Sequence, residues 1–506
     1  MSTVPHISMK GITKIFGKVI ANNNINLEIN SGEIHSLLGE NGAGKSTLMN
    51  ILSGIYIPDR GSIFISGKEM KFSAPKDAIN AKIGMIHQHF KLVEVMSSLE
   101  NIMIGQNTNF FINKNKVIKD ITDLSDMYGL EVDVNKRVYD MTVGEKQILE
   151  ILKVMYRGAK ILVLDEPTTV FTPQETKKLF KIINKMKQQG CAIIFISHKM
   201  DEVMELSDKI TVLRKGETIA TLDTKDTNPM KLAELMVGHP VDLCIKKVKF
   251  ESMENILEVK DLKVLDEDGI ARVKKMCFTI GEGEILGMAG IVNSGQKELC
   301  EALIGMQPVK DGEINFKGEN IVGKNTREII KKGISMSFIP EDRLGMGLVS
   351  SMDMVDNLML KEYHSQKGFF IDKKPAVIIA NEIITKLEIK TPGIYYPINN
   401  LSGGNIQKIL LGRELAANPK LLIMAYPVRG LDINTCYTIY DLINQQKAKG
   451  VGVLFIGEDL DVLIQLCDRV MVICGGEITG ILNSDNATKE EIGLLMTGHK
   501  NTLQQA

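Results

Sequence analysis

A stretch of nine residues near the N-terminus has the composition and spacing of a phosphate-binding loop. Its glycines, lysine and hydroxyl side chains follow the pattern G-x-x-x-x-G-K-S, which lets backbone amides surround phosphate oxygens at the start of a helix. Lys45 is expected to reach the terminal phosphates of ATP, and the Ser46 hydroxyl to bind Mg²⁺. A glycine-rich turn without this role is the alternative. The residues predicted to contact ATP are Gly39, Glu40, Asn41, Gly42, Ala43, Gly44, Lys45, Ser46 and Thr47.

Two adjacent carboxylates, Asp165 and Glu166, follow the apolar run Ile161 to Leu164. At the end of a strand, one carboxylate can hold Mg²⁺ while the other polarises the attacking water. We therefore predict that Asp165 is a metal ligand and that Glu166 is catalytic. An isolated pair of this kind is more often a solvated turn. Its position downstream of a phosphate loop favours the catalytic interpretation.

Three further side chains are candidates for the same site. His198 follows the apolar run Ala192 to Ser197, where an imidazole can contact a γ-phosphate. Gln88 is predicted to sense phosphate and to bind the metal; the histidines on either side of it also suggest metal binding, but a third ligand is not near in sequence. Phe16 is predicted to stack on adenine, with a core aromatic as the alternative.

The segments around these residues indicate which elements position them. Apolar residues after the phosphate loop fall at helical spacing, and Glu175 to Lys187 is a second amphipathic helix. The predicted strands are Ile34 to Leu38, Ile161 to Asp165 and Ala192 to Ser197. Strands that alternate with helices indicate an α/β fold around a mostly parallel sheet.

The chain contains an internal repeat. The sequence M-V-G-H at residues 236–239 recurs as M-T-G-H at 496–499, and 496 minus 236 is 260. The phosphate loop has a counterpart that begins at Gly290, 251 residues after Gly39. A repeat of this length predicts tandem domains. We place them at residues 1–240 and 257–500, with a linker at residues 241–256.

Composition excludes several other classes of protein. With 61 basic and 62 acidic side chains the net charge is -1, which gives no bulk electrostatic attraction to nucleic acid. The apolar runs are of strand length and none approaches a membrane span. The start of the chain lacks the pattern of a signal peptide, so we expect the protein to stay in the cytosol. Seven cysteines without CxxC spacing disfavour zinc and iron-sulfur sites.

Together these motifs resemble those of the nucleotide-binding domains of ABC transporters. In that family the loop at residues 39–47 is the Walker A motif, Gln88 the Q-loop, residues 161–166 the Walker B motif with its catalytic glutamate, and His198 the switch histidine. The resemblance implies an ATPase that uses ATP and Mg²⁺. It also implies an α/β fold of two tandem P-loop NTPase domains, each with a mostly parallel core sheet and a helical subdomain.

The family's signature motif LSGGQ is nearly intact in the second half and altered in the first. It reads L-S-G-G-N at residues 401–405 and M-T-V-G-E at residues 141–145. In this family two cassettes pair head to tail, so the signature of one completes the ATP site of the other. The resemblance therefore adds Ser402, Gly403, Gly404 and Asn405 to the ATP-binding residues. The opposite site would place the Glu145 carboxylate against phosphate, a repulsion of roughly 4 kcal/mol at ~4 Å and an effective dielectric near 20.

The second half has lost most of the catalytic side chains. Gln296 stands where the first half has Lys45, and Lys297, one residue late, could still contact phosphate. The remaining replacements, in the order Asp165, Glu166, Gln88 and His198, are Ala425, Tyr426, Glu341 and Glu458. One competent site and one degenerate site are therefore expected.

Tandem cassettes of this kind resemble the ATP-binding subunits of bacterial ribose, galactose and nucleoside importers, and several stretches lean toward the nucleoside branch. The resemblance implies two integral membrane permease subunits, an extracytoplasmic solute-binding protein, no nucleic acid, and a peripheral position at the cytoplasmic face of the cell membrane. Motion would pass to the permeases through a groove beside Gln88 and the helical segment from Ser97 to Gly129. The alternative is a tandem-cassette translation factor on the ribosome, a class that usually keeps two working sites and a long charged linker.

Overall fold

The computed structural model describes residues 5–87, 90–105, 114–169, 171–240, 243–248, 250, 254–291, 293–331, 336–340, 342–363, 366 and 370–499. The chain divides into two compact units, Met1–Asp242 and Leu243–Ala506. This division falls within the stretch 241–256 that the sequence predicts to be a linker. No helix in the described ranges is both long and apolar enough to span a membrane.

The first unit alternates strands and helices along the chain. Its strands are β1 (Ile7–Phe16), β2 (Val19–Ile29), β3 (Ile34–Leu38), β4 (Arg60–Ile65), β5 (Lys68–Met70), β6 (Ile83–Ile86), β7 (Ile161–Asp165), β8 (Ala192–Ile196), β9 (Lys209–Arg214) and β10 (Glu217–Asp223). Its helices are α1 (Lys45–Leu52), α2 (Pro75–Asn80), α3 (Ser98–Met103), α4 (Lys114–Tyr128), α5 (Val143–Tyr156), α6 (Pro173–Gln188), α7 (Met200–Leu206) and α8 (Pro229–Val237).

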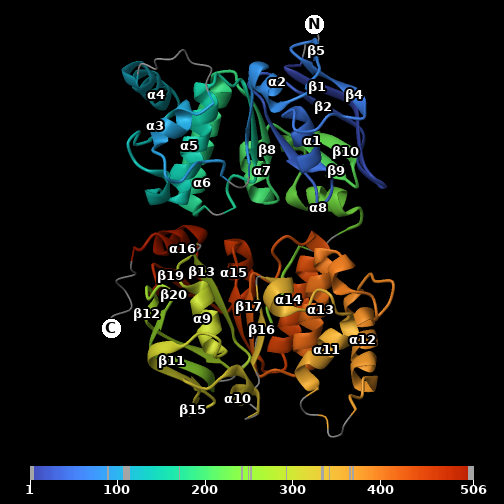
Figure 1. The fold of residues 1–506 in the computed structure, drawn as a ribbon, viewed down its shortest axis with the longest axis vertical. Helices are drawn as coiled ribbons and strands as arrows, with labels where there is room; N and C mark the ends of the chain where they lie inside the picture. The colour runs from blue at the N-terminus through green and yellow to red at the C-terminus, as the bar shows by residue number, and fades with distance from the viewer. Residues whose placement is uncertain are drawn as a thin grey trace. The chain divides into compact units, whose positions relative to one another are not determined.

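Two sheets organise this unit. A six-stranded sheet has the order β10-β9-β3-β8-β7-β6, and every neighbouring pair in it is parallel except β9 and β10. A separate antiparallel sheet has the order β2-β1-β4-β5. Helices α3, α4 and α5 gather at one side of the unit, and β1, β2 and β4 lie at the other (Figure 1).

The central strands β3 and β8 are buried along their whole length. All five residues of β3 and all five of β8 are buried, because a parallel sheet is covered on both faces. The predicted bounds of β3 and β7 are those observed, and α6 extends a little beyond the predicted helix at both ends. Leu48, Met49, Ile51 and Leu52 of α1 are fully buried, which confirms the helical spacing read from the sequence.

The second unit repeats this order of elements. Its strands are β11 (Asn255–Leu265), β12 (Ala271–Gly281), β13 (Ile285–Gly290), β14 (Val309–Phe316), β15 (Glu319–Asn320), β16 (Met336–Ile339), β17 (Leu421–Ala425), β18 (Gly452–Ile456), β19 (Arg469–Cys474) and β20 (Glu477–Asn483). Its helices are α9 (Gln296–Leu303), α10 (Thr326–Lys331), α11 (Met354–Glu362), α12 (Lys374–Leu387), α13 (Gly403–Ala416), α14 (Ile433–Lys447), α15 (Leu460–Leu466) and α16 (Lys489–Met496).

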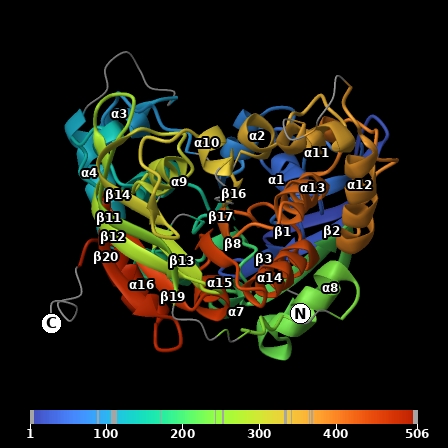
Figure 2. The same ribbon diagram turned by 90° about the horizontal axis from the view of Figure 1, so that it is seen from below.

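Sheets and helices of this unit correspond to those of the first. The main sheet has the order β16-β17-β18-β13-β19-β20, in which only β19 and β20 are antiparallel, and a second sheet has the order β12-β11-β14-β15. Helices α11, α12 and α13 lie together, apart from β11, β12 and β14 (Figure 2). The predicted class, two P-loop units each with a mostly parallel sheet and a helical subdomain, is therefore confirmed.

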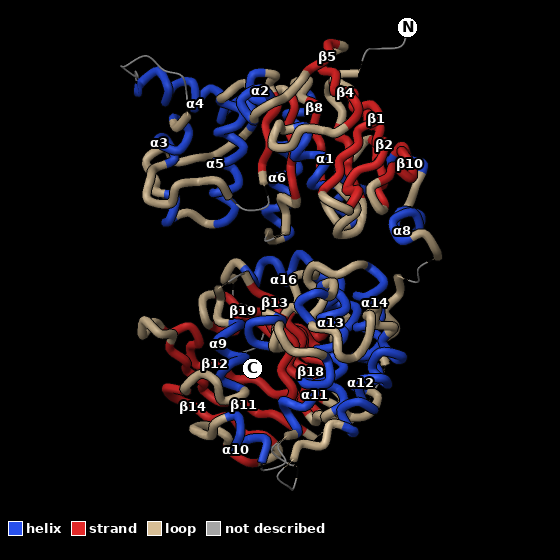
Figure 3. Tube along the Cα trace, turned by 45° about the vertical axis from the view of Figure 1, so that its right-hand side comes forward, coloured by secondary structure: helices blue, strands red, loops and turns tan. Residues whose placement is uncertain are grey.

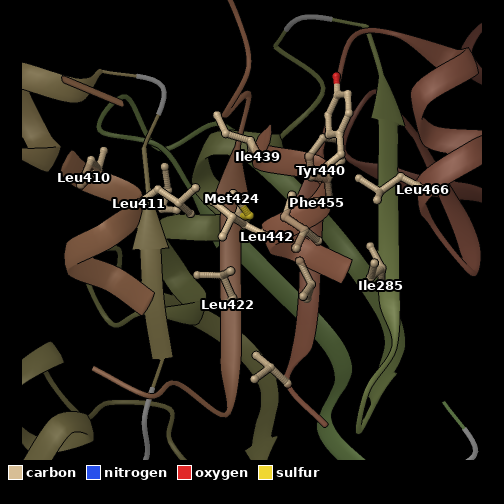
Figure 4. Packing of buried hydrophobic residues seen from close by; sticks show 14 of the residues in the cluster. Ile285, Leu410, Leu411, Leu422, Met424, Ile439, Tyr440, Leu442, Phe455 and Leu466 are labelled. Carbon is tan, nitrogen blue, oxygen red and sulfur yellow. The ribbon is translucent and has the colours of Figure 1, made fainter. Parts of the chain in front are cut away.

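The core of the second unit forms where β17 and β18 meet the helices. Met424 and Phe455 from these strands pack with Ile439 and Tyr440 of α14 and with Leu410 of α13 (Figure 4). All five are no more than 4% exposed. This apolar layer fixes α13 and α14 against the sheet whose strand ends carry the loops.

The two units also share unusual backbone conformations at matching positions. Gly44 and Gly295, each just before the helix that follows the phosphate loop, both have a φ of 101°. Glu166 directly follows β7 and Tyr426 directly follows β17, and their φ values are 48° and 49°. The two units therefore share these positive-φ backbone conformations, although Glu166 of the first unit is replaced by Tyr426 in the second.

An ion pair beside the central strand recurs in both units. Lys187 Nζ lies 2.6 Å from Asp208 Oδ1, and Lys447 Nζ lies 2.5 Å from Asp468 Oδ1. Each aspartate also accepts a hydrogen bond of 2.9 Å from the first backbone N–H of the central strand, β3 or β13. The same side chains therefore tie a helix to the start of the phosphate-loop strand in both halves.

Candidate functional site

The phosphate loop joins β3 to α1 and is shaped by its glycines. The N–H of Ala43 donates to the carbonyl of Glu40 at 3.0 Å, which turns the loop before the helix begins. A Cβ atom at Gly44 would lie 2.5 Å from the carbonyl oxygen of Ala21, and the φ of 101° is itself unfavourable for other residues. A Cβ atom at Gly42 would meet nothing within 4 Å, so the loop is open at its tip. Only glycine fits at position 44, and the open tip of the loop leaves room for phosphate.

Lys45 folds back over this loop from the first position of α1. Its Nζ donates to the carbonyl oxygens of Gly39 at 2.5 Å and of Glu40 at 3.1 Å. The side chain is 8% exposed, and burial lowers the pKa of the ammonium group. Ser46 is exposed beside it, with Thr47 half-buried and Asn41 exposed. The cation is thus held at the loop and the hydroxyl of Ser46 faces solvent, as phosphate and metal binding require.

Glu166 and His198 come together from the ends of two neighbouring strands. Strands β7 and β8 are paired in parallel, so their carboxyl ends meet at one edge of the sheet. The backbone N–H of Glu166 donates to the carbonyl of Ile196 at 2.9 Å, and Nδ1 of His198 lies 3.1 Å from Oε1 of Glu166. The hydrogen bond from His198 lowers the pKa of Glu166. Glu166 is therefore a carboxylate at neutral pH.

Asp165 occupies the last position of β7, directly before Glu166. Burial and the charge of Glu166 raise the pKa of Asp165 to about 6, although Lys45 acts in the opposite direction. A bound divalent cation would relieve the repulsion between the adjacent carboxylates, which adds to burial in raising the pKa of Asp165. Mg²⁺ keeps several of its own waters and needs few protein ligands, so Asp165 and the exposed Ser46 fit it.

Phe16 lies at the end of β1 and is 43% exposed. Its ring is edge-on to Tyr56 at 5.3 Å between centroids, and Lys14 Nζ lies 5.4 Å from its centroid. The ring is therefore held in place on one side and open on the other. This arrangement suits stacking on a base and does not suit the core role that was the alternative.

Gln88 lies outside the described residues, so its two predicted roles stay predictions. His87, the residue before it, is half-buried, and burial lowers the pKa of its imidazole. In the part of the chain that the structure describes, no group of three His, Cys, Asp or Glu side chains could hold a metal ion.

The two signature segments begin α5 and α13 and differ in how their side chains are bound. In the second unit, Asn405 Nδ2 donates to Ser402 Oγ at 2.9 Å, and Asn405 Oδ1 accepts from the N–H of Lys390 at 3.0 Å. Gly403 and Gly404 are the first residues of α13 and have no side chains to cover its N-terminus. This segment therefore leaves its helix start accessible to an anion.

In the first unit, the Glu145 carboxylate at the position of Asn405 is already hydrogen-bonded to residues of its own unit. Glu145 Oε2 accepts from the N–H of Thr142 at 2.7 Å, and Lys136 Nζ donates to both oxygens at 2.7 and 2.8 Å. The pattern Thr142-x-x-Glu145 is a capping box, which is recognisable in the sequence. The repulsion of roughly 4 kcal/mol expected above assumed an unpaired charge. Pairing with Lys136 reduces it.

The degenerate loop of the second unit keeps its shape with different chemistry. Gln296, 4% exposed, donates from Nε2 to the carbonyl of Ile291 at 2.9 Å and accepts from the N–H of Ser294 at 3.0 Å. Lys297 points to solvent, 74% exposed, and lies 3.8 Å from Glu301. A neutral amide thus braces the loop where the first unit has a cation.

The strand ends of the second unit likewise lack catalytic groups. Ala425 and Tyr426 stand at the positions of Asp165 and Glu166 but carry no carboxylate. The backbone bond is the same, because the N–H of Tyr426 donates to the carbonyl of Ile456 at 2.9 Å. Glu458, at the position of the switch histidine, lies 3.4 Å from Arg429. These described residues offer neither the metal carboxylate nor the base predicted for the first unit.

The fold and the phosphate loop define a tandem P-loop ATPase. Residues 22–169 and 273–428 match the family model described as ABC transporter. The chain belongs to the ABC transporter family, and as a member of it binds and hydrolyses ATP.

Three relatives match over nearly their whole lengths. The nucleoside import ATP-binding protein NupA of Lactococcus lactis is 40% identical over 497 residues, 97% of this chain and 98% of its own. The guanosine import ATP-binding protein NupO of Bacillus subtilis is 40% identical over 503 residues, 97% of each chain. The ribose import ATP-binding protein RbsA 1 of Rubrobacter xylanophilus is 35% identical over 499 residues, 98% of each chain. Nothing in these comparisons supports the ribosomal alternative.

Proposed function

We propose that this chain is the ATP-hydrolysing subunit of an importer for nucleosides. The support is that the nucleoside and guanosine import proteins are each 40% identical to it, whereas the ribose import protein is 35% identical. Simple sugars are the second candidate class of solute. The transport path itself lies in two separate membrane permease subunits, which receive solute from an extracytoplasmic binding protein.

The contact between Glu166 and His198 beside the phosphate loop carries the catalytic part of the proposal. Lys45 and the loop amides hold the phosphates, and Phe16 stacks on the base. Glu166, kept ionised by His198, orients the attacking water and accepts its proton, while His198 contacts the γ-phosphate. Bound Mg²⁺, held by Ser46, Asp165 and Gln88, supplies charge neutralisation at the phosphates.

The signature of the second unit completes this site in our proposal. Within the first unit, α1 and α5 stand at different sides of β8 (Figures 1 and 3), so the loop at Lys45 is not served by the signature of its own unit. We propose that Ser402, Gly403, Gly404 and Asn405 reach the phosphates when ATP binds, in the head-to-tail pairing of the family. The partial positive charge at the start of α13 favours that contact.

A surface cavity lined in part by His87, the residue before Gln88 in sequence, is the proposed docking site of a permease helix. Its volume is about 280 Å³, and its lining includes Ile55, Ile79, Val154, Arg157 and His87. Ile55 and Ile79 line the same cavity and are 44% and 39% exposed, so two apolar side chains are available to an apolar partner. A helix seated there would contact His87, which directly precedes Gln88 in sequence. The chain would then lie at the cytoplasmic face of the membrane as a peripheral subunit.

The solute class is tested with the assembled complex of this chain, its permeases and its binding protein in membranes. Nucleosides should stimulate phosphate release, and ribose or galactose should not. Stimulation by a sugar alone would replace the nucleoside proposal with the sugar one. Failure to co-purify with permeases, together with sedimentation on ribosomes, would overturn the transport role.

The catalytic roles are tested by a matched pair of substitutions at equivalent strand ends. Glu166→Gln should abolish phosphate release by the complex while ATP binding is retained. Tyr426→Phe, at the same backbone position of the second unit, should change the rate less than about two-fold. Equal losses from the two variants would contradict a single competent site.

A further inference from the structure

The two segments that present Glu166 and His198 are joined by a buried carboxylate on a third element. Glu202 of α7 accepts through Oε2 from Thr168 Oγ1 at 2.6 Å and from Ser197 Oγ at 3.0 Å. Thr168 lies two residues after Glu166, and Ser197 immediately precedes His198. Glu202, Thr168 and Ser197 are 9%, 1% and 3% exposed. A single oxygen therefore ties the two catalytic segments together away from water.

Lys199 closes these contacts into a ring. Its Nζ lies 3.2 Å from Glu202 Oε1 and donates to the carbonyl oxygen of Thr168 at 3.1 Å. Its backbone N–H donates to Ser197 Oγ at 3.1 Å. The buried charge of Glu202 is thus compensated by a cation and two hydroxyl donors, and a fully satisfied network of this kind holds its members rigidly.

The second unit has lost every member of this ring while keeping its backbone. At the offset of 260 residues, Thr168, Ser197, Lys199 and Glu202 correspond to Val428, Gly457, Asp459 and Val462. The strand-end conformation nevertheless persists, as the φ values of 48° and 49° at residues 166 and 426 show. The ring is therefore not needed to build the fold. It is present where the catalytic pair is present.

We propose that Glu202 is a positioning residue for ATP hydrolysis, which keeps the side chains of Glu166 and His198 at their contact of 3.1 Å through Thr168 and Ser197. This inference rests on the roles proposed above for Glu166 and His198. Glu202 touches neither of them and acts through the segments that carry them. Its removal should therefore slow the chemical step and leave the phosphate loop and its affinity for ATP intact.

The experiment measures kcat and KM for ATP in the full chain assembled with its permeases. Glu202→Val, which installs the residue type of the second unit, should lower kcat by roughly 100-fold, the cost of misplacing a catalytic group by about 1 Å. KM for ATP should stay within about two-fold. Glu202→Gln keeps an oxygen acceptor for both hydroxyls and should retain kcat within about five-fold. Val462→Ala is the matched control and should leave kcat unchanged.

Three results would overturn the proposal: unchanged kcat in Glu202→Val, an equal loss in Glu202→Gln, or a rise in KM that parallels the fall in kcat. Thermal unfolding of each variant reports whether it folds. If Glu202→Val does not fold, the double variant Thr168→Val with Ser197→Ala removes the same two bonds, and its kcat decides in the same way.

Glu166→Gln is measured in parallel. Turnover retained in Glu166→Gln would reject the proposed catalytic roles, whatever the effect at Glu202.

Discussion

Gln296 Nε2 donates to the carbonyl oxygen of Ile291 at 2.9 Å, in the position where Lys45 Nζ donates to the carbonyl of Glu40 at 3.1 Å. The amide reproduces the structural bond of the lysine without its charge. The loop of the second unit is therefore closed by the protein itself, and its integrity does not depend on a nucleotide.

Removing this amide should affect stability and not catalysis. Gln296→Ala leaves the carbonyl of Ile291 and the N–H of Ser294 without their partner, at a cost of about 1 to 3 kcal/mol in the free energy of unfolding. Thermal unfolding of the chain measures this loss. Phosphate release by the complex should change less than about two-fold, whereas Lys45→Ala should abolish it. A loss of turnover in Gln296→Ala comparable to that in Lys45→Ala would show that the second loop takes part in hydrolysis.

The raised pKa of Asp165 predicts a pH-dependent stability of the nucleotide-free protein. Because the folded pKa of about 6 lies above the ordinary aspartate pKa of 3.8, the stabilising contribution of the protonated carboxyl is fully present below about pH 3.8 and is lost as the pH rises through 6. The loss at pH 8 is at most about 3 kcal/mol. Asp165→Asn should therefore raise the midpoint of thermal unfolding at pH 8 by more than at pH 5.

A mirror variant in the second unit provides the control for this pH effect. Ala425, at the position of Asp165, is 8% exposed and ends β17. Ala425→Asp should lower the unfolding midpoint, and more strongly at pH 8 than at pH 5, because the new buried carboxyl must ionise. If either variant shifts the midpoint equally at the two pH values, burial of Asp165 does not control its ionisation.

Phe16 should contribute to nucleotide affinity and little to turnover. Loss of one aromatic stacking contact of about 0.5 to 1.5 kcal/mol would weaken ATP binding by roughly 2- to 12-fold. Titration of Phe16→Ala with a fluorescent ATP analogue measures the change, and Phe16→Tyr should bind as the native chain does. Ile20→Ala, which removes a 52% exposed apolar side chain from the adjacent strand, serves as the control. Equal weakening in Phe16→Ala and Ile20→Ala would count against stacking by Phe16.

Restoring an uncharged signature in the first unit should not create a second active site. Glu145→Gln removes the carboxylate but keeps a capping oxygen, and Glu145 is 40% exposed at its side chain, so the stability cost should stay below about 1 kcal/mol. Phosphate release should remain at the native rate, because Gln296, Ala425 and Tyr426 still lack the catalytic groups. A doubling of the rate of phosphate release would mean that Glu145 alone had prevented hydrolysis at the degenerate site.

Local patterns predicted the elements that carry the site. The strand before the phosphate loop and the strand that ends at Asp165 were placed at their observed bounds. The first is delimited by the glycine-rich loop after it, and the second by the carboxylates at the end of a continuous apolar run. The antiparallel sheet of each unit was not foreseen, since pairing between β1 and β4 joins residues some fifty positions apart in sequence.

Side-chain networks were the least predictable part of the site. Glu202 lies 34 residues from Thr168, so their bond appears only after β7, β8 and α7 have assembled. In the sequence, the replacement of Lys45 by Gln296 indicates only the loss of a cation. The hydrogen bonds of Gln296 to Ile291 and Ser294 depend on how the loop turns around the side chain. The capping box at Glu145, in contrast, was readable from a spacing of three residues.

The left-handed conformation shared by Glu166 and Tyr426 has a consequence for the second unit. A non-glycine residue at a φ of 49° costs roughly 1 to 2 kcal/mol, and at Tyr426 no catalytic carboxylate accompanies that cost. At this strand end the two units therefore differ in their side chains and not in their main-chain conformation. A return to hydrolysis would need a carboxylate at residue 426, where the backbone conformation of the first unit is already in place.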